Sequence, residues 1–97
     1  MSTPETEQKG MIKQWLSLRG FFNFPILQGL GAHRGIPDII AAKKGKVFAI
    51  EVKAKGKSGR MGGQSDHQKN FERQWTEAGC MYICGDLDAV IAALYDL

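Results

Sequence analysis

The chain has 97 residues, of which 43% are hydrophobic and 24% are charged, and its net charge is +3. This length and composition allow a single globular domain over residues 1–97 and exclude a disordered chain. No apolar run approaches the ~20 residues that span a bilayer, and no signal peptide opens the chain, so we expect a cytoplasmic protein with no membrane contact.

The first predicted element is a helix that begins after Thr3 and ends at Gly20. Thr3 is a suitable N-cap, and Pro4 is favoured at the first helical position. Apolar residues recur at helical spacing and predict an inward stripe made of Met11, Ile12, Trp15, Leu16 and Leu18. Residues 21–27 are rich in aromatic side chains but contain a proline, which predicts an edge strand.

Residues 38–42 and 47–53 predict a hairpin closed by residues 43–46. Four glycines within residues 56–63 then predict a mobile loop. Ser65 and Gln68 have the spacing of a capping box, which predicts a helix to about residue 78.

The helix from residue 65 is expected to turn Phe71 and Trp75 toward the core. Residues 81–84 predict a short buried strand, and we expect Cys80 and Cys84 to be free and buried. Asp86 is expected to cap a last helix, whose inward residues would be Leu87, Val90, Ile91 and Leu94.

The predicted elements follow the order α-β-β-β-α-β-α. This order indicates an α/β (α+β) fold in which helices flank a mixed central sheet. A right-handed crossover should make the strands at residues 47–53 and 81–84 parallel.

Two acids and a lysine stand out within the hairpin. Side chains alternate along a strand, so Glu51 and Lys53 should share a face, roughly 6–7 Å apart. A carboxylate in an apolar run is costly unless it is paired or bound to a metal. With Asp38 at the neighbouring strand, the group suits Mg²⁺, which prefers oxygen ligands. The alternative is a turn-forming Asp38 beside the solvated face of an amphipathic strand.

The chain's positive charge is concentrated around these acids. Residues 33–73 hold ten of the thirteen Lys and Arg residues and four of the ten acids, a balance of +6, whereas the rest of the chain has a balance of −3. This distribution favours a polyanionic partner held across a metal, although a solvated lysine-rich face would show the same pattern.

These motifs together resemble a known nuclease family. The Pro-Asp and Glu-x-Lys pattern is similar to that of the PD-(D/E)xK nuclease superfamily, whose core is restriction-endonuclease-like. The run from Arg34 to Asp38, the run Glu51-Val52-Lys53 and the pair Ser65 and Gln68 resemble the VRR-Nuc (virus-type replication-repair nuclease) family in particular. The similarity extends over roughly residues 5–85 and implies a stand-alone enzyme of phage type, working in a phage or bacterial host cell.

The resemblance implies roles for specific residues. Asp38 and Glu51 would bind Mg²⁺ or Mn²⁺ with the backbone carbonyl of Val52, and Lys53 would act as a base or stabilise charge on the phosphate. A third acid on the first helix is expected to reach the metal, with Glu7 favoured over Glu5.

Further residues are expected beside the metal and along the nucleic acid. Gln68 would lie next to the site or would serve only the capping box. Phosphate-binding bases are expected on both sides of the acids, at Arg34, Lys55, Lys57 and Arg60.

The expected function is that of a metal-dependent DNA endonuclease acting on branched or Holliday-junction DNA in replication, repair or recombination. A symmetric cut across a junction implies a homodimer, with the Trp15-bearing helix and the Phe21-Phe22 edge as candidate surfaces. The alternative is a non-catalytic nucleic-acid-binding module on a nuclease fold. An RNA-directed nuclease is a third possibility.

Overall fold

The computed structural model of the protein describes residues 3–29, 31–56 and 63–97. In chain order its elements are α1 (Pro4–Leu18), β1 (Phe22–Pro25), β2 (Ile39–Lys43), β3 (Lys46–Val52), α2 (Asp66–Glu77), β4 (Met81–Gly85) and α3 (Leu87–Leu94). This order confirms the predicted fold class. Within the described residues, none of the helices is long and apolar enough to cross a membrane.

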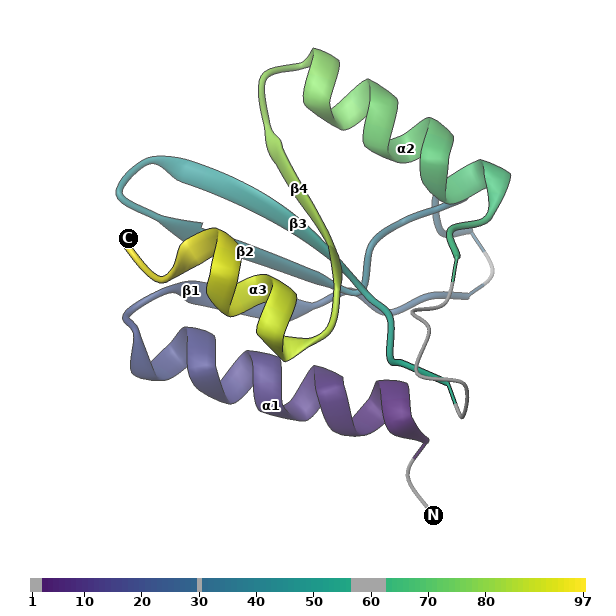
Figure 1. The fold of residues 1–97 in the computed structure, drawn as a ribbon. Coiled ribbons are helices and arrows are strands. Elements are labelled where there is room, and N and C mark those ends of the chain that lie inside the picture. The colour runs from purple at the N-terminus through teal and green to yellow at the C-terminus, as the bar shows by residue number, and fades with distance from the viewer. Residues whose placement is uncertain (1–2, 30, 57–62) are drawn as a thin grey trace.

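The four strands form one mixed sheet in the order β1-β2-β3-β4 (Figure 1). β1 pairs with β2 and β2 with β3 in antiparallel fashion, whereas β3 and β4 are parallel, with Glu51 opposite Cys84. The predicted parallel pairing of these two strands and the edge position of β1 are therefore confirmed. The β2–β3 turn places Lys44 and Gly45 at positive φ (52° and 80°), as a two-residue hairpin turn requires.

α1 and α3 lie against one face of the sheet and enclose the main core (Figure 1). The Thr3 hydroxyl caps α1 by accepting from the Thr6 N–H at 3.1 Å, as predicted. The fully buried residues of this core come from both helices and the two central strands, β2 and β3: Ile12, Leu16, Ile39, Ala41, Phe48, Ile50, Val52, Val90 and Leu94.

The inward stripe of α1 is narrower than predicted. Met11 is 41% exposed and Leu18 79% exposed, so both were wrongly placed in the core. A helix lying on a flat sheet buries only the residues that face it, here Ile12 and Leu16, with Trp15 half-buried beside Phe21.

α2 lies apart from α1 and α3, next to β4 (Figure 1). Ser65 and Gln68 form the predicted capping box. No residue of α2 is fully buried: Phe71 and Trp75 stack on each other, their ring centroids 5.6 Å apart, and Phe71 meets the ring of Tyr82. Phe71 and Trp75 thus lie on the side of α2 that faces the sheet, as expected, but they are only half-buried and do not join the main core, because α2 packs against the edge strand β4.

β4 is an edge strand, so the prediction of a short buried strand was right about the strand and wrong about its burial. Only Gly85 of β4 is buried, and Cys80 and Cys84 are free but half-buried. The final helix begins as predicted, with the Asp86 carboxylate accepting from the Ala89 N–H at 3.1 Å.

Candidate active site

A cavity of about 490 Å³ opens at the end of the sheet where β2 begins and β3 ends. The start of α1, the segment after β1, the ends of β2 and β3, and the start of α2 all contribute to it. Its lining residues are Glu5, Lys9, Pro25, Ile26, Leu27, Gln28, Asp38, Glu51, Lys53 and Gln68. The structure therefore brings together Asp38, Glu51, Lys53 and Gln68, which are far apart in the sequence.

Asp38 is fixed by backbone hydrogen bonds on both sides. Its N–H donates to the Ile50 carbonyl at 3.0 Å, and its carbonyl accepts from the Ile26 N–H at 2.8 Å. Its side chain is only 7% exposed, and Oδ2 accepts from the Val52 N–H at 2.7 Å. Oδ1 is the oxygen that no backbone N–H engages; Lys9 and Gln28 approach it.

The loop before Asp38 is pressed against the start of α2. Gly35 has a φ of +76°, and a Cβ built there would lie 2.1 Å from the backbone oxygen of His67. Any side chain at this position would push the loop away from α2. The glycine of the Arg-Gly-Ile-Pro-Asp run is thus explained by close backbone contact, which sets the position of Asp38 relative to Gln68.

Glu51 is the most deeply buried charged group of the site. It is 3% exposed, and its Oε1 has no hydrogen-bond partner among the described residues. Burial raises the pKa of its carboxyl to about 8; the negative charge of Asp38 acts in the same direction, and Lys53 opposes it. Because an unpartnered buried carboxylate is costly, this oxygen favours a proton or a cation.

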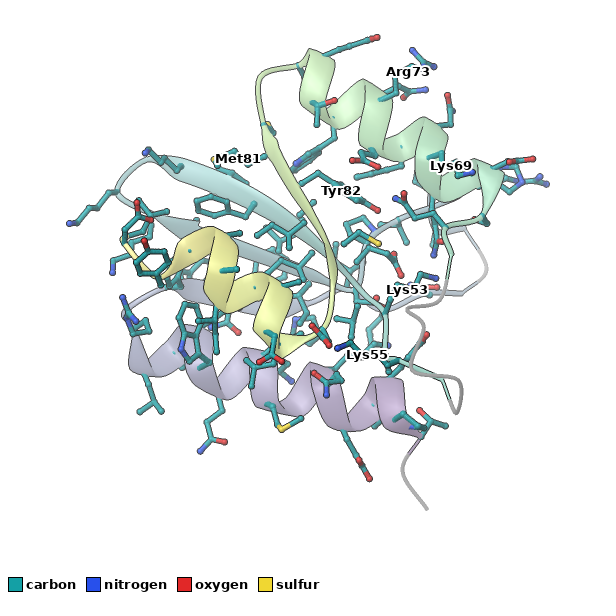
Figure 2. All side chains as sticks on the ribbon, in the orientation of Figure 1. Lys53, Lys55, Lys69, Arg73, Met81 and Tyr82 are labelled. Atoms are coloured by element: carbon teal, nitrogen blue, oxygen red, sulfur yellow. The ribbon has the colours of Figure 1, made fainter. Side chains whose placement is uncertain are left out.

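Two lysines from different elements approach the two acids. Lys53 Nζ lies 3.9 Å from Glu51 Oε2, which agrees with the shared face expected from strand alternation. Figure 2 shows Lys53 just beyond the end of β3 and Lys55 further along the same segment. Lys9 of α1 reaches the other acid, with its Nζ 3.0 Å from Asp38 Oδ1.

The structure does not bring Glu7 to the cavity. Glu5 and Lys9 are four residues apart and face it together, whereas Glu7 lies roughly 200° around the helix from Glu5 and is exposed. Glu5, the alternative acid, lines the cavity although its own side chain is exposed.

Gln68 takes part in the capping box and lines the cavity at the same time. Its Oε1 accepts from the Ser65 N–H at 2.9 Å, and its own N–H donates to the Ser65 hydroxyl at 3.2 Å. Gln68 can therefore cap α2 and lie beside the carboxylates at the same time.

Arg34 lines a second cavity of about 390 Å³ that shares Gln28 and Gln68 with the first. Its Nη1 lies 3.4 Å from Nε2 of the exposed His67. Lys55 is exposed and lines a third hollow with the start of α1. Lys57 and Arg60 fall outside the described residues, as does most of the predicted mobile loop.

Two polar lining residues were missed by the sequence analysis. Lys9 follows Glu5 by one helical turn, a spacing that would have placed both on one face. Gln28 donates weakly to Asp38 Oδ1 (3.4 Å) from a glycine-flanked segment, where no sequence signal identifies it.

The side chains fit a small divalent cation in some respects. Two carboxylates converge, and one buried oxygen lacks a partner. Across the part of the chain that the structure describes, no group of three or more His, Cys, Asp and Glu side chains converges as a metal site. Any ion held here would therefore depend on two carboxylates supplemented by backbone oxygen or water.

No protein-family model matches the sequence, and no curated protein matches it. Among solved structures, one described as a VRR_NUC domain is similar, with a TM-score of 0.76 and 19% sequence identity. The match covers 97% of this chain and 99% of that chain. The protein thus has the fold of a VRR_NUC domain, a nuclease-type fold, along nearly its whole length. This result confirms the fold that the motif resemblance implied.

Proposed function

We propose that the protein is a Mg²⁺- or Mn²⁺-dependent DNA endonuclease. The observation that carries the proposal is the pair of buried carboxylates at the end of the sheet, with Glu51 Oε1 unpartnered and Lys53 beside it. The nuclease-type fold supports the same function. A divalent ion bound there would polarise the scissile phosphodiester and lower the pKa of a water.

Asp38 and Glu51 would supply the charged ligands. The carbonyl of Val52 would add a neutral one, because the N–H and C=O of a strand residue point to the same side and the Val52 N–H faces Asp38. Glu5 would be the acid of α1 that acts through a water, because Glu5 lines the cavity and Glu7 does not.

Lys53 would stabilise negative charge on the phosphate. It is 13% exposed and is held between the Glu51 carboxylate and the cavity. A largely buried ammonium group acts with little screening by solvent, which strengthens its effect on a nearby phosphoryl group. Gln68 shares the cavity and would orient the water or the substrate.

Positive side chains around the cavity would hold the DNA backbone. Arg34 lies on the α2 side and Lys55 on the α1 side of the carboxylates. Lys57 and Arg60, known here only from the sequence, add charge to the segment that follows Lys55. Such contacts bind phosphates without reading sequence, which suits recognition of DNA shape, and we propose branched or junction DNA as the substrate.

A symmetric cut of a junction would require a homodimer. Phe21 is 4% exposed and Trp15 is half-buried against it, so neither offers a free surface. Phe22 and Phe24 on the edge strand β1 are 71% and 42% exposed, with ring centroids 5.7 Å apart. We propose this strand as the surface through which two copies meet.

The proposal is tested by incubating the protein with linear duplex, flap, splayed and four-way DNA of one sequence, in Mg²⁺ or in excess EDTA. We expect Mg²⁺-dependent cleavage that is fastest on a branched substrate. Binding without cleavage in Mg²⁺ and Mn²⁺ would favour the non-catalytic module, and equal cleavage in EDTA would contradict the metal-dependent mechanism.

A further inference from the structure

Lys9 makes the shortest ion pair in the described residues, and it does so with a proposed metal ligand. Its Nζ lies 3.0 Å from Oδ1 of Asp38, whose side chain is 7% exposed, while Lys9 itself is 41% exposed. A lysine that served only as a solvated residue of α1 would extend its ammonium group into water and not toward a buried carboxylate. The contact therefore belongs to the cavity.

Lys9 contacts the oxygen of Asp38 that no backbone N–H engages. Oδ2 is already engaged by the Val52 N–H, and Oδ1 has Lys9 at 3.0 Å and the Gln28 amide at 3.4 Å. Glu51 is arranged differently: Oε2 lies 3.9 Å from Lys53, and Oε1 has no partner. Of the four carboxylate oxygens, Glu51 Oε1 alone has no partner among the described residues, whereas Asp38 Oδ1 and Glu51 Oε2 each face a lysine.

The charges around Asp38 and Glu51 also favour a single divalent ion. Glu5, Asp38 and Glu51 carry three negative charges when ionised, and Lys9 and Lys53 supply two positive charges, so the lining of the cavity has a balance of −1. One divalent ion changes this balance to +1, whereas a second would raise it to +3 and bring more positive charge close to both ammonium groups. Such like-charge crowding is strongly unfavourable where solvent is partly excluded.

We propose that Lys9 is the fixed second cation of this site, holding Asp38 Oδ1 so that the protein binds a single divalent ion. This inference rests on the proposed function and adds the number of ions and the residue that sets it. Lys9 is a positioning residue, which holds Asp38 in place, and it competes electrostatically with the ion for that carboxylate.

The test is calorimetric titration of Mn²⁺ into DNA-free protein, comparing wild type with Lys9→Met and Lys13→Met. Lys13 lies one turn further along α1 and does not line the cavity. Lys13→Met therefore makes the same substitution in the same helix, with the same loss of charge, but away from Asp38. Lys9→Arg retains the charge and serves as the conservative variant. Thermal unfolding of the metal-free proteins gives a second readout.

We expect one Mn²⁺ per wild-type chain. Removal of the competing charge in Lys9→Met should tighten Mn²⁺ binding about two- to fivefold relative to Lys13→Met, the range for a partly exposed ion pair. Without metal, Lys9→Met should unfold at a lower temperature than Lys13→Met, because Asp38 loses its counter-ion. Lys9→Arg should behave as wild type in both measurements.

Two Mn²⁺ ions per wild-type chain, or equal affinities in the Lys9→Met and Lys13→Met variants, would overturn the role of Lys9 while leaving a metal-dependent nuclease intact. No Mn²⁺ binding by any of the proteins would instead contradict the proposed function, and the role of Lys9 with it.

Discussion

Lys53 is placed to act on the reaction rather than on DNA binding. Its Nζ is 3.9 Å from Glu51, and it is mostly buried, whereas Lys55 is exposed outside the carboxylate cavity. We expect Lys53→Ala to lower kcat by about 10²–10³ with little change in DNA affinity, because it removes a charge contact made in the transition state. The matched variant Lys55→Ala should weaken DNA binding and retain kcat.

Single-turnover cleavage and DNA binding, measured on both variants, separate the two roles. A Lys53→Ala protein that cleaves at the wild-type rate would reduce Lys53 to a strand residue without a part in the chemistry.

The raised pKa of Glu51 predicts a pH-dependent cost in stability. Its ordinary value of 4.5 applies to the unfolded chain, and its folded value is about 8, so the folded protein binds this proton more tightly. The associated stability is complete below about pH 4.5 and is lost as the pH rises toward 8. Glu51→Gln, which does not ionise, should therefore become progressively more stable than wild type between these values.

Urea unfolding at pH 5 and pH 8 in a chelating buffer measures this difference. An advantage of Glu51→Gln that is the same at both pH values would show that Glu51 ionises in the folded protein as readily as in the unfolded one.

At the scale of residues, strand alternation was sufficient to predict that Glu51 and Lys53 share a face. The contact of Lys9 with Asp38 was not predictable, because it depends on how α1 is rotated about its axis relative to the sheet. The placement of Glu5 rather than Glu7 depends on the same rotation. Local sequence fixes a helix's period but leaves this angle to the packing of Ile12 and Leu16.

The loop before β2 is in close backbone contact with the start of α2. Gly35→Ala would combine a positive φ with a Cβ 2.1 Å from a backbone oxygen. We expect a loss of about 2–4 kcal/mol in the free energy of unfolding, the sum of backbone strain and overpacking. Gly45→Ala is the matched control, since it also has a positive φ (+80°) but meets nothing within 4 Å. It should lose only about 1–2 kcal/mol.

Chemical denaturation of the two variants measures these losses, and circular dichroism checks that both remain folded. An equal loss of unfolding free energy in the two variants would mean that the loop moves away from α2 without an energetic penalty. In that case the loop does not fix Asp38 relative to α2.

At the scale of elements, the sequence predicted existence and order because each boundary has a local chemical signal. Thr3, Ser65 and Asp86 cap the three helices, and glycine marks the hairpin turn. The depth of burial was less accessible: Met11, Leu18, Phe71 and Trp75 are apolar at helical spacing, yet a small sheet does not cover them all. The close contact of Gly35 with His67 joins segments that are far apart in the sequence, so no local sequence pattern predicts it.

For the molecule as a whole, the exposed β1 edge predicts self-association. Phe22→Lys places a charge on the proposed interface at a position that is 71% exposed, so the fold of each copy should tolerate it. We expect sedimentation to give a dimer for wild type and a monomer for this variant. Gln74→Lys, on α2 at the opposite edge of the sheet, should remain dimeric.

If wild type sediments as a monomer at concentrations that support cleavage, the proposed dimer is wrong. In that case the two strands of a junction would have to be cut in separate encounters.

Asp38 and Glu51 are proposed to form a metal-dependent nuclease centre. Nicking of supercoiled DNA in Mg²⁺ tests it most directly when Asp38→Asn is compared with Asp88→Asn, the same chemical change at an exposed position of α3. We predict that wild type and Asp88→Asn nick at equal rates, that EDTA stops both, and that the folded Asp38→Asn protein is slower by at least about a hundredfold. Nicking by Asp38→Asn at the wild-type rate would contradict the proposal.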